Sequence, residues 1–289
     1  MVRPIIVVGI FCCAWLSSTV TAQKTGSVAM AVWSQDEVAV AADSRVSRSQ
    51  SYLDSSCKVA TFDNKLVFVA TGRSSPGADP SWDAYAVGSK EFKKISSKGA
   101  TDHIALKLAD VWGEDARVEF QRLGSKGVGG LDNDLILTGL FTDFEKDGTL
   151  LIAMSEVSFE IIQTKRIKVI AHTKLIPTSK SDSDSVFLGH SEIVNAVNNP
   201  QTPEEMKWRT EFVPTALRWS GEHADDVMGK AAAYVELTIE HLPKTKKDAK
   251  GVPFSVVGFP VAAVRLIRGK NVDWIARGRC TDQIGPPAR

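Results

Sequence analysis

Two short segments of the chain place chemically active side chains directly after a strand-like run. The first, VAVAADSR at residues 38–45, passes from small and β-branched apolar residues to Asp43, Ser44 and Arg45. The second, VFLGHS at residues 186–191, ends in a serine just before a helical pattern begins. An acid close to a base can close a strand as a solvated surface ion pair, or it can supply charge to a site at the edge of a sheet. Both interpretations of the first segment stay open at this point.

The second segment has the form of a serine nucleophile elbow, a tight turn from strand to helix that exposes a hydroxyl for acyl transfer. Asp225 or Asp226 and then His241 follow Ser191 in the chain order of an α/β-hydrolase triad. The G-x-S-x-G pattern lacks its last glycine because Ile193 stands there. No HGG-type oxyanion segment precedes it, and N-terminal hairpins do not suit a mainly parallel sheet. A serine esterase that uses Ser191 is therefore the least favoured enzymatic interpretation.

Other kinds of site find little support in the sequence. The histidines form neither an H-E-x-x-H motif nor a close pair, so we predict no metal site; they stand at positions 103, 172, 190, 223 and 241. The glycine-rich run at residues 127–130 lacks the Lys-Ser/Thr of a phosphate loop, and we expect no bound cofactor. The basic run KTKKDAK at residues 244–250 is typical of a solvated loop.

The N-terminus has the pattern of a secretory signal peptide. Arg3 precedes twelve apolar residues at 5–16, and small residues at Val20 and Ala22 form a cleavage site. Twelve residues are too few to cross a bilayer, which needs about 20. We therefore predict that residues 1–22 are removed, that no stable membrane span remains, and that the protein is exported to the periplasm or the extracellular space.

Export would decide the charge and the redox state of the mature chain. Without the leader, the chain has 34 basic and 34 acidic residues, and a neutral chain gives no reason to expect a nucleic-acid partner. Cys57 and Cys280 are the cysteines left in the mature chain. In an oxidising compartment they could form a disulfide, and a pair of buried free thiols is the alternative.

Hydrophobic spacing predicts strands, then two helices, then strands, helices and strands again. Strand-like runs lie at 26–33, 37–44, 58–72, 135–141, 149–157, 167–176, 186–191, 253–267 and 273–279, and helical spacing at 81–123, 192–199, 204–219 and 223–241. This order is typical of an α+β protein in which helices stack outside antiparallel sheets. No repeat or linker divides it, so we expect residues 23–289 to form a single domain.

The N-terminal strands also carry an ordered set of motifs. In TGSVAMAVWSQDEVAVAADSR and YLDSSCKVATFDNKLVFVATG, Thr25 starts the first strand and ADSR ends the second. Tyr52-Leu53 follows, Lys58-Val59 opens the third strand, and Gly72 ends the fourth. Over these fifty or so residues the chain resembles proteasome β-type subunits and the related bacterial proteasome-like peptidase, which are N-terminal nucleophile (Ntn) hydrolases. The resemblance implies a four-layer αββα sandwich with antiparallel sheets.

The resemblance also implies a role for each matched residue. Thr25 matches the nucleophile, whose hydroxyl is activated by the free α-amine of the same residue. Asp43 and Lys58 match the acid and base beside it, and Gly72 matches the glycine whose backbone N–H faces the developing oxyanion. Ser191 matches a supporting serine. The implied function is an exported threonine-type peptidase or amidase that acts on a peptide or small amide and assembles with copies of itself.

The chain departs from this family at its first hairpin. The stretch from Thr25 to ADSR is two residues longer than is usual, so Ser27 would hold the first position if the family's length were kept, whereas the apolar pattern favours Thr25. Lys24 precedes Thr25, where self-cleaving precursors of the family usually have glycine. Cleavage after Ala22 would leave two residues before Thr25 and no free amine on it. A non-catalytic Ntn-like binding or assembly protein is therefore the alternative function.

Overall fold

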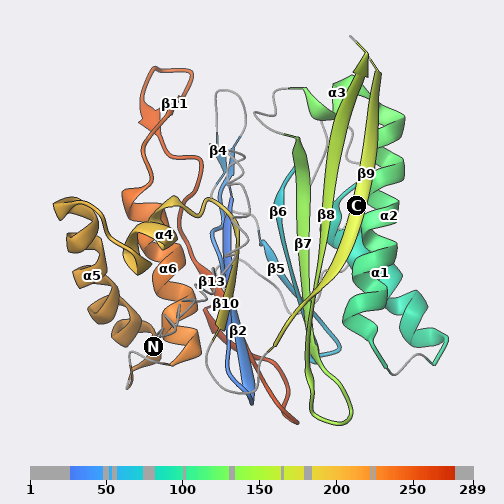
Figure 1. The fold of residues 1–289 in the computed structure, drawn as a ribbon, viewed down its shortest axis with the longest axis horizontal. Helices are drawn as coiled ribbons and strands as arrows, with labels where there is room; N and C mark the ends of the chain where they lie inside the picture. Colours follow the sequence, from blue (N-terminus) through green and yellow to red (C-terminus); the bar gives the residue numbers. More distant parts are fainter. Residues whose placement is uncertain are drawn as a thin grey trace, which may run out of the picture.

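Two five-stranded antiparallel sheets lie face to face in the computed structural model, and helices cover their outer faces (Figure 1). The structure describes residues 27–47, 52–53, 57–73, 82–99, 102–129, 134–163, 166–178, 184–221, 223 and 226–276. The leader, Thr25 and Cys280 lie outside these ranges, so the predictions about them remain predictions. The α+β class and the antiparallel sheets expected from the sequence are confirmed.

The first sheet joins the start of the described chain to its end. Its strand order is β10-β1-β2-β13-β14, and its members are β1 (Val28–Trp33), β2 (Glu37–Ala42), β10 (Asp184–Gly189), β13 (Ala262–Ile267) and β14 (Asp273–Ala276). β1 and β2 form the hairpin expected from the N-terminal pattern. β1 is therefore held between β2 and β10, a strand that comes about 150 residues later in the chain.

The second sheet follows chain order throughout. It contains β5 (Val59–Phe62), β6 (Leu66–Gly72), β7 (Leu135–Phe144), β8 (Leu150–Gln163) and β9 (Arg166–Ile176). A turn at residues 63–65 divides the strand-like run at 58–72 into β5 and β6. Two-residue pairs complete the strands: β3 (Val46–Ser47) with β4 (Tyr52–Leu53), and β11 (Lys246–Lys247) with β12 (Pro253–Phe254).

The helices divide between the two outer faces. α1 (Ala84–Ser97) and α2 (Ile104–Leu123) cover the second sheet, followed by the short α3 (Ser125–Val128). α4 (Glu192–Asn198), α5 (Pro203–Ser220) and α6 (Val227–His241) lie on the side of the first sheet. α5 begins with a capping box between Thr202 and Glu205, which satisfies backbone N–H groups that the first turn leaves unpaired. In the described part of the chain, none of the helices has the length and apolar character needed to cross a membrane.

Successive side chains of β1 alternate between two apolar layers, one on each face of the first sheet. Val28, Met30 and Val32 pack with residues of α4 and α6, whereas Ala29 and Trp33 point into the core between the two sheets. Successive side chains of a strand point to opposite faces, so a strand that is buried throughout needs packing partners on both sides. A third apolar cluster, between the second sheet and α1 with α2, completes the arrangement of helix, sheet, sheet, helix.

Three sequence expectations were wrong in detail. The helical spacing was expected to end at residue 123, but the short helix α3 follows it. The run at residues 253–267 was expected to be one strand, but it divides into β12 and β13, with an irregular stretch between them that contains a cis Phe259–Pro260 bond. Proline lacks the N–H that a strand needs for pairing. The N–H of Gly258 donates to the Asp43 carboxylate and its carbonyl accepts from the Ser44 N–H, so neither group is available for strand pairing. The basic run at 244–250 contributes β11 to a small hairpin and is not a loop throughout.

Candidate functional site

Asp43 is the centre of a buried polar cluster at the end of β2. Its side chain is fully buried and accepts four hydrogen bonds. Oδ1 receives the backbone N–H of Val28 at 3.0 Å and the ammonium of Lys58 at 2.7 Å. Oδ2 receives the backbone N–H groups of Arg45 at 3.1 Å and Gly258 at 3.2 Å. Both oxygens are therefore satisfied, as a buried carboxylate requires.

Lys58 enters the cluster from the other sheet. It directly precedes β5 and is 5 % exposed, so its ammonium needs partners within the protein. Nζ donates to Asp43 and also to Ser27 Oγ, at 3.0 Å. The ion pair of Asp43 thus reaches across the two sheets to Lys58. The alternative interpretation, in which Asp43 closes the strand as part of a solvated surface ion pair, was wrong because Asp43 is fully buried.

Ser27 supplies the hydroxyl of the cluster. It directly precedes β1, is 5 % exposed, and accepts the hydrogen bond of Lys58 through Oγ. The sequence favoured Thr25 as the nucleophile, and Thr25 lies outside the described residues. Among the side chains that the structure describes, Ser27 supplies a hydroxyl in contact with Lys58. The structure therefore brings together Ser27, Asp43 and Lys58, a hydroxyl, a carboxylate and an ammonium.

The segment that contains Ser255 and Gly258 holds the last residues of the ADSR motif in place. Arg45 Nη1 donates to the Ser255 carbonyl at 3.0 Å, and the Ser44 N–H donates to the Gly258 carbonyl at 3.1 Å. A side chain at residue 258 would push the Arg45 guanidinium out of its present position. Sequence analysis missed Ser255 and Gly258. The available signal was a glycine inside an otherwise β-prone run, which often marks a close approach of two backbones.

Gly72 lies on the strand next to Lys58. The register pairs Val59 with Val69, which places Ala70 opposite Lys58 and Gly72 two residues, about 7 Å, further along β6. The Tyr85 hydroxyl lies 2.8 Å from the Lys58 carbonyl and 3.1 Å from that of Ala70. Complete burial raises the pKa of Tyr85, so it stays a neutral hydroxyl. Tyr85 from α1 thus ties the backbone beside Lys58 to β6, a contact that sequence analysis did not anticipate.

Ser191 is close in the fold to Ser27 but makes none of the contacts described for the cluster. It is buried at the N-cap of α4 and makes no capping hydrogen bond. Its neighbour His190 is also buried, and the His190 N–H donates to the Ser27 carbonyl at 3.2 Å. His190 Nδ1 lies 3.5 Å from Glu192 Oε1, and this interaction lowers the pKa of Glu192.

The alternative triad around Ser191 is not assembled. His241 Nε2 is paired with Glu211 at 2.7 Å, and its ring stacks on Trp208. Asp226 caps the opposite end of α6, about 20 Å from His241 along the helix. β10, which leads to Ser191, is an edge strand that pairs antiparallel with β1, unlike the parallel sheet of an α/β-hydrolase. Asp225 lies outside the described residues.

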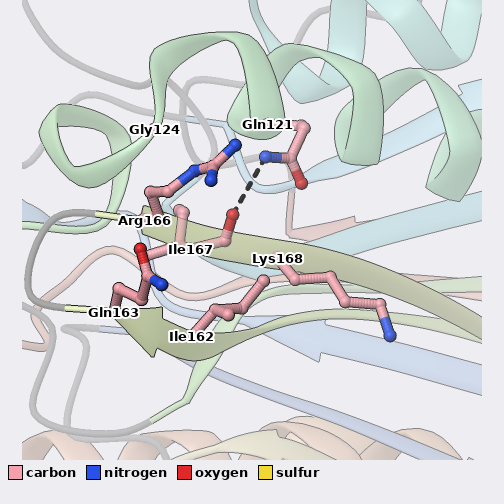
Figure 2. Close-up of a pocket in the computed structure, with 7 residues that line it drawn as sticks. All are labelled: Gln121, Gly124, Ile162, Gln163, Arg166, Ile167 and Lys168. Carbon is pink, nitrogen blue, oxygen red and sulfur yellow. Dashed lines mark hydrogen bonds between the residues drawn. The ribbon is translucent and has the colours of Figure 1, made fainter.

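The described surface pockets lie away from the buried cluster. One is lined by the tip of the β8–β9 hairpin and the end of α2, where Gln121 bridges to the backbone of β9 through Ile167 and Val169 (Figure 2). Another lies at the β7–β8 turn and includes Asp143 and Arg268. Neither includes any of the predicted site residues. In the described ranges, no group of three or more His, Cys, Asp or Glu side chains is placed to hold a metal ion.

Comparisons with known proteins do not assign this chain to a family. A scan against models of protein families finds no match, and a search of curated proteins finds no similar sequence. The functional argument therefore depends on the ordered motifs and on the geometry of the buried cluster.

Proposed function

We propose that this protein is an exported amide or peptide hydrolase of the Ntn type, with Ser27 as its nucleophile. The observation that carries the proposal is the position of Lys58 Nζ, 2.7 Å from the Asp43 carboxylate and 3.0 Å from the Ser27 hydroxyl. The motif order and the layered sheets with outer helices support the same assignment. Cys57 is disulfide-bonded, which suits an oxidising compartment, and pairing with Cys280 remains a prediction.

The choice of Ser27 in place of Thr25 has two supports. Counting from Ser27 keeps the family's usual spacing to the ADSR motif, which counting from Thr25 lengthens by two residues. The residue before Ser27 is Gly26, and glycine is what self-cleaving precursors of this family usually have before the nucleophile, whereas Lys24 precedes Thr25. The contact with Lys58 adds a structural reason that the sequence pattern alone did not offer.

The mechanism is acyl transfer. Once the peptide bond before Ser27 has been opened, the new α-amine takes the hydroxyl proton while Oγ attacks the substrate carbonyl. Lys58, held by Asp43, donates to Oγ and stabilises its developing negative charge. A backbone N–H near Gly72 holds the oxyanion. The amine leaving group takes the proton, and water then releases the acyl group from the Ser27 ester.

The N-terminus of the mature protein tests this proposal. Intact mass and N-terminal sequencing should find Ser27 at the start of the chain, and an electrophilic probe for N-terminal nucleophiles, such as a β-lactone, should label it. Ser27→Ala should abolish labelling, and the matched variant Thr25→Ala should leave it unchanged. A chain that begins at Thr25 and loses labelling only in Thr25→Ala would return the role to Thr25. A chain that begins at Gln23 and resists the probe would favour a non-catalytic binding or assembly protein.

A further inference from the structure

The outer edge of β9 has no strand paired with it in the described part of the chain. β9 closes the second sheet, and β8 is the strand that pairs with it. Figure 1 shows β9 at the border of this sheet, next to α2. A strand edge presents N–H and C=O groups to which another chain segment can bind, and natural edge strands are commonly kept short. β9 is 11 residues long, which leaves room for an added strand.

The side chain of Gln121 already bonds to one part of this edge. Its amide nitrogen donates to the Ile167 carbonyl at 3.0 Å, the bond drawn in Figure 2, and its amide oxygen accepts the Val169 N–H at 2.8 Å. A side chain of α2 thus makes two hydrogen bonds of the kind that a neighbouring strand would make. These bonds also identify Ile167 and Val169 as residues whose backbone groups point away from β8.

Three further residues of β9 have outward backbone groups that Gln121 does not reach. The N–H and C=O groups of successive residues point to opposite sides of an antiparallel strand. Ala171, Thr173 and Leu175 therefore point outward, as Ile167 and Val169 do. Among the described strands, none pairs with this side of β9. We call Ala171, Thr173 and Leu175 the open edge.

The charged side chains next to the open edge are basic. β9 contains no acidic residue, and its basic side chains are Arg166, Lys168, His172 and Lys174. Ile167 belongs to the apolar cluster beneath α2, so the even-numbered side chains lie together on the opposite face of the strand. A strand added at the open edge would place its own side chains directly beside this basic row.

β8 shows which charge the basic row accepts from a neighbouring strand. Lys174 Nζ lies 3.0 Å from Glu156 of β8, and Lys168 Nζ lies 3.9 Å from Glu160. Opposite charges on adjacent strands stabilise their pairing, and like charges directly opposite each other destabilise it. An acidic strand at the open edge would repeat the arrangement of β8 on the other side of the same lysines.

We propose that the open edge binds an extended acidic segment of another polypeptide, which joins the second sheet as a further strand. Hydrogen bonds to the outward backbone groups supply affinity, and the basic row selects for acidic side chains. The site lies on β9 and uses none of the residues of the buried Ser27 cluster. The proposal is therefore independent of the proposed function, and Ser27→Ala should bind the same segment as the parent does.

A second copy of this chain matches the open edge less well than an acidic segment. Antiparallel two-fold pairing centred on Thr173 places His172 opposite Lys174 of the copy. Pairing centred on Ala171 places Lys168 opposite Lys174 of the copy. Both arrangements set basic side chains against each other, which weakens strand pairing.

The test measures binding of two fluorescent peptides to the full-length exported protein by fluorescence anisotropy. Both are extended peptides of about six residues, one alternating valine with glutamate and the other alternating valine with lysine. The acidic peptide should bind, more weakly as salt is added, and the basic peptide should not. Hydrogen exchange followed by NMR should slow at the Thr173 and Leu175 amides when the acidic peptide binds.

Two pairs of variants separate backbone pairing from charge. Thr173→Pro removes an outward N–H at a position where an edge strand tolerates proline, and it should weaken binding by at least about 10-fold. Thr173→Val also loses the hydroxyl contact with Ser155 but keeps the N–H, so it should bind as the parent does. Lys168→Gln with Lys174→Gln should weaken binding about 3- to 10-fold and reduce its dependence on salt.

The matched charge control is Lys244→Gln with Lys250→Gln, at exposed lysines near β11, and it should bind as the parent does. No binding of the acidic peptide at about 1 mM, or equal binding of the basic peptide, would overturn the proposal. A parent that is dimeric by light scattering and a monomeric Thr173→Pro would assign the edge to a second copy and overturn it too. Should Thr173→Pro fail to fold, the glutamine variants and the amide exchange decide.

Discussion

At the residue scale, the buried pair of Asp43 and Lys58 is the feature on which the candidate site depends. Removing two charges from water is costly, and the cost is offset only when geometry and hydrogen bonds are good. Asp43 meets this condition through three backbone N–H groups in addition to Lys58. The pair therefore positions an ammonium beside the Ser27 hydroxyl at a site from which water is largely excluded.

Asp43→Asn should lower both the stability of the fold and the labelling of Ser27 by the β-lactone probe. The substitution leaves the Lys58 ammonium buried without its counter-charge, and breaking such a pair typically costs about 3–5 kcal/mol. Chemical denaturation would measure the loss of unfolding free energy. The double variant Asp43→Asn with Lys58→Met removes both charges and should recover much of the stability but none of the β-lactone labelling. Equal stability of Asp43→Asn and the parent would contradict the buried pairing.

At the element scale, α1 is connected to the candidate site by one hydroxyl. Tyr85 projects from α1 to the backbone of β5 and β6, where it contacts the carbonyls of Lys58 and Ala70. The hydrogen bond from Tyr85 on α1 thus fixes the position of the Lys58 backbone just before β5. A contact of this kind affects the site through Lys58, so we regard Tyr85 as a positioning residue.

Tyr85→Phe should slow labelling of Ser27 more than its loss of stability explains. Removing the hydroxyl leaves buried carbonyl groups unpaired, at a cost of about 1–3 kcal/mol. Tyr234→Phe is the matched control because its hydroxyl bonds to Asn198 on the other side of the molecule. Labelling rates and melting temperatures of both variants should show a similar loss of stability, with slower labelling only in Tyr85→Phe. Equal labelling by the two variants would argue against positioning by Tyr85.

At the scale of the whole molecule, Asp143 on β7 makes stability depend on pH. Burial raises the pKa of Asp143 to about 7, while Lys65 opposes the shift. The folded state therefore binds a proton more tightly than the unfolded state, whose aspartate pKa is about 3.9. Stability from this group is fully present below about pH 4 and is lost as pH rises through about 7.

Asp143→Asn should stabilise the protein at pH 8, because the variant need not ionise a buried group. We expect a gain of roughly 1–3 kcal/mol after allowance for partial solvent exposure, which should fade as pH falls towards 4. Urea denaturation of parent and variant across this range would measure the difference. Asp110→Asn, at an exposed position of α2, should show no such trend. A difference between Asp143→Asn and the parent that did not change with pH would contradict the assignment.

The sequence by itself determined the local elements and part of the candidate site. Alternation predicted the β1–β2 hairpin, spacing predicted α1 and α2, and the motif order singled out Asp43 and Lys58, because these signals depend on residues close together in the chain. Three contacts were decided only by the tertiary structure. Lys58 donates to the hydroxyl of Ser27, the Gly258 N–H donates to Asp43, and the His190 N–H donates to the Ser27 carbonyl. These partners are separated by 31, 215 and 163 residues, and contacts between such distant segments depend on strand order and register, which local patterns do not encode.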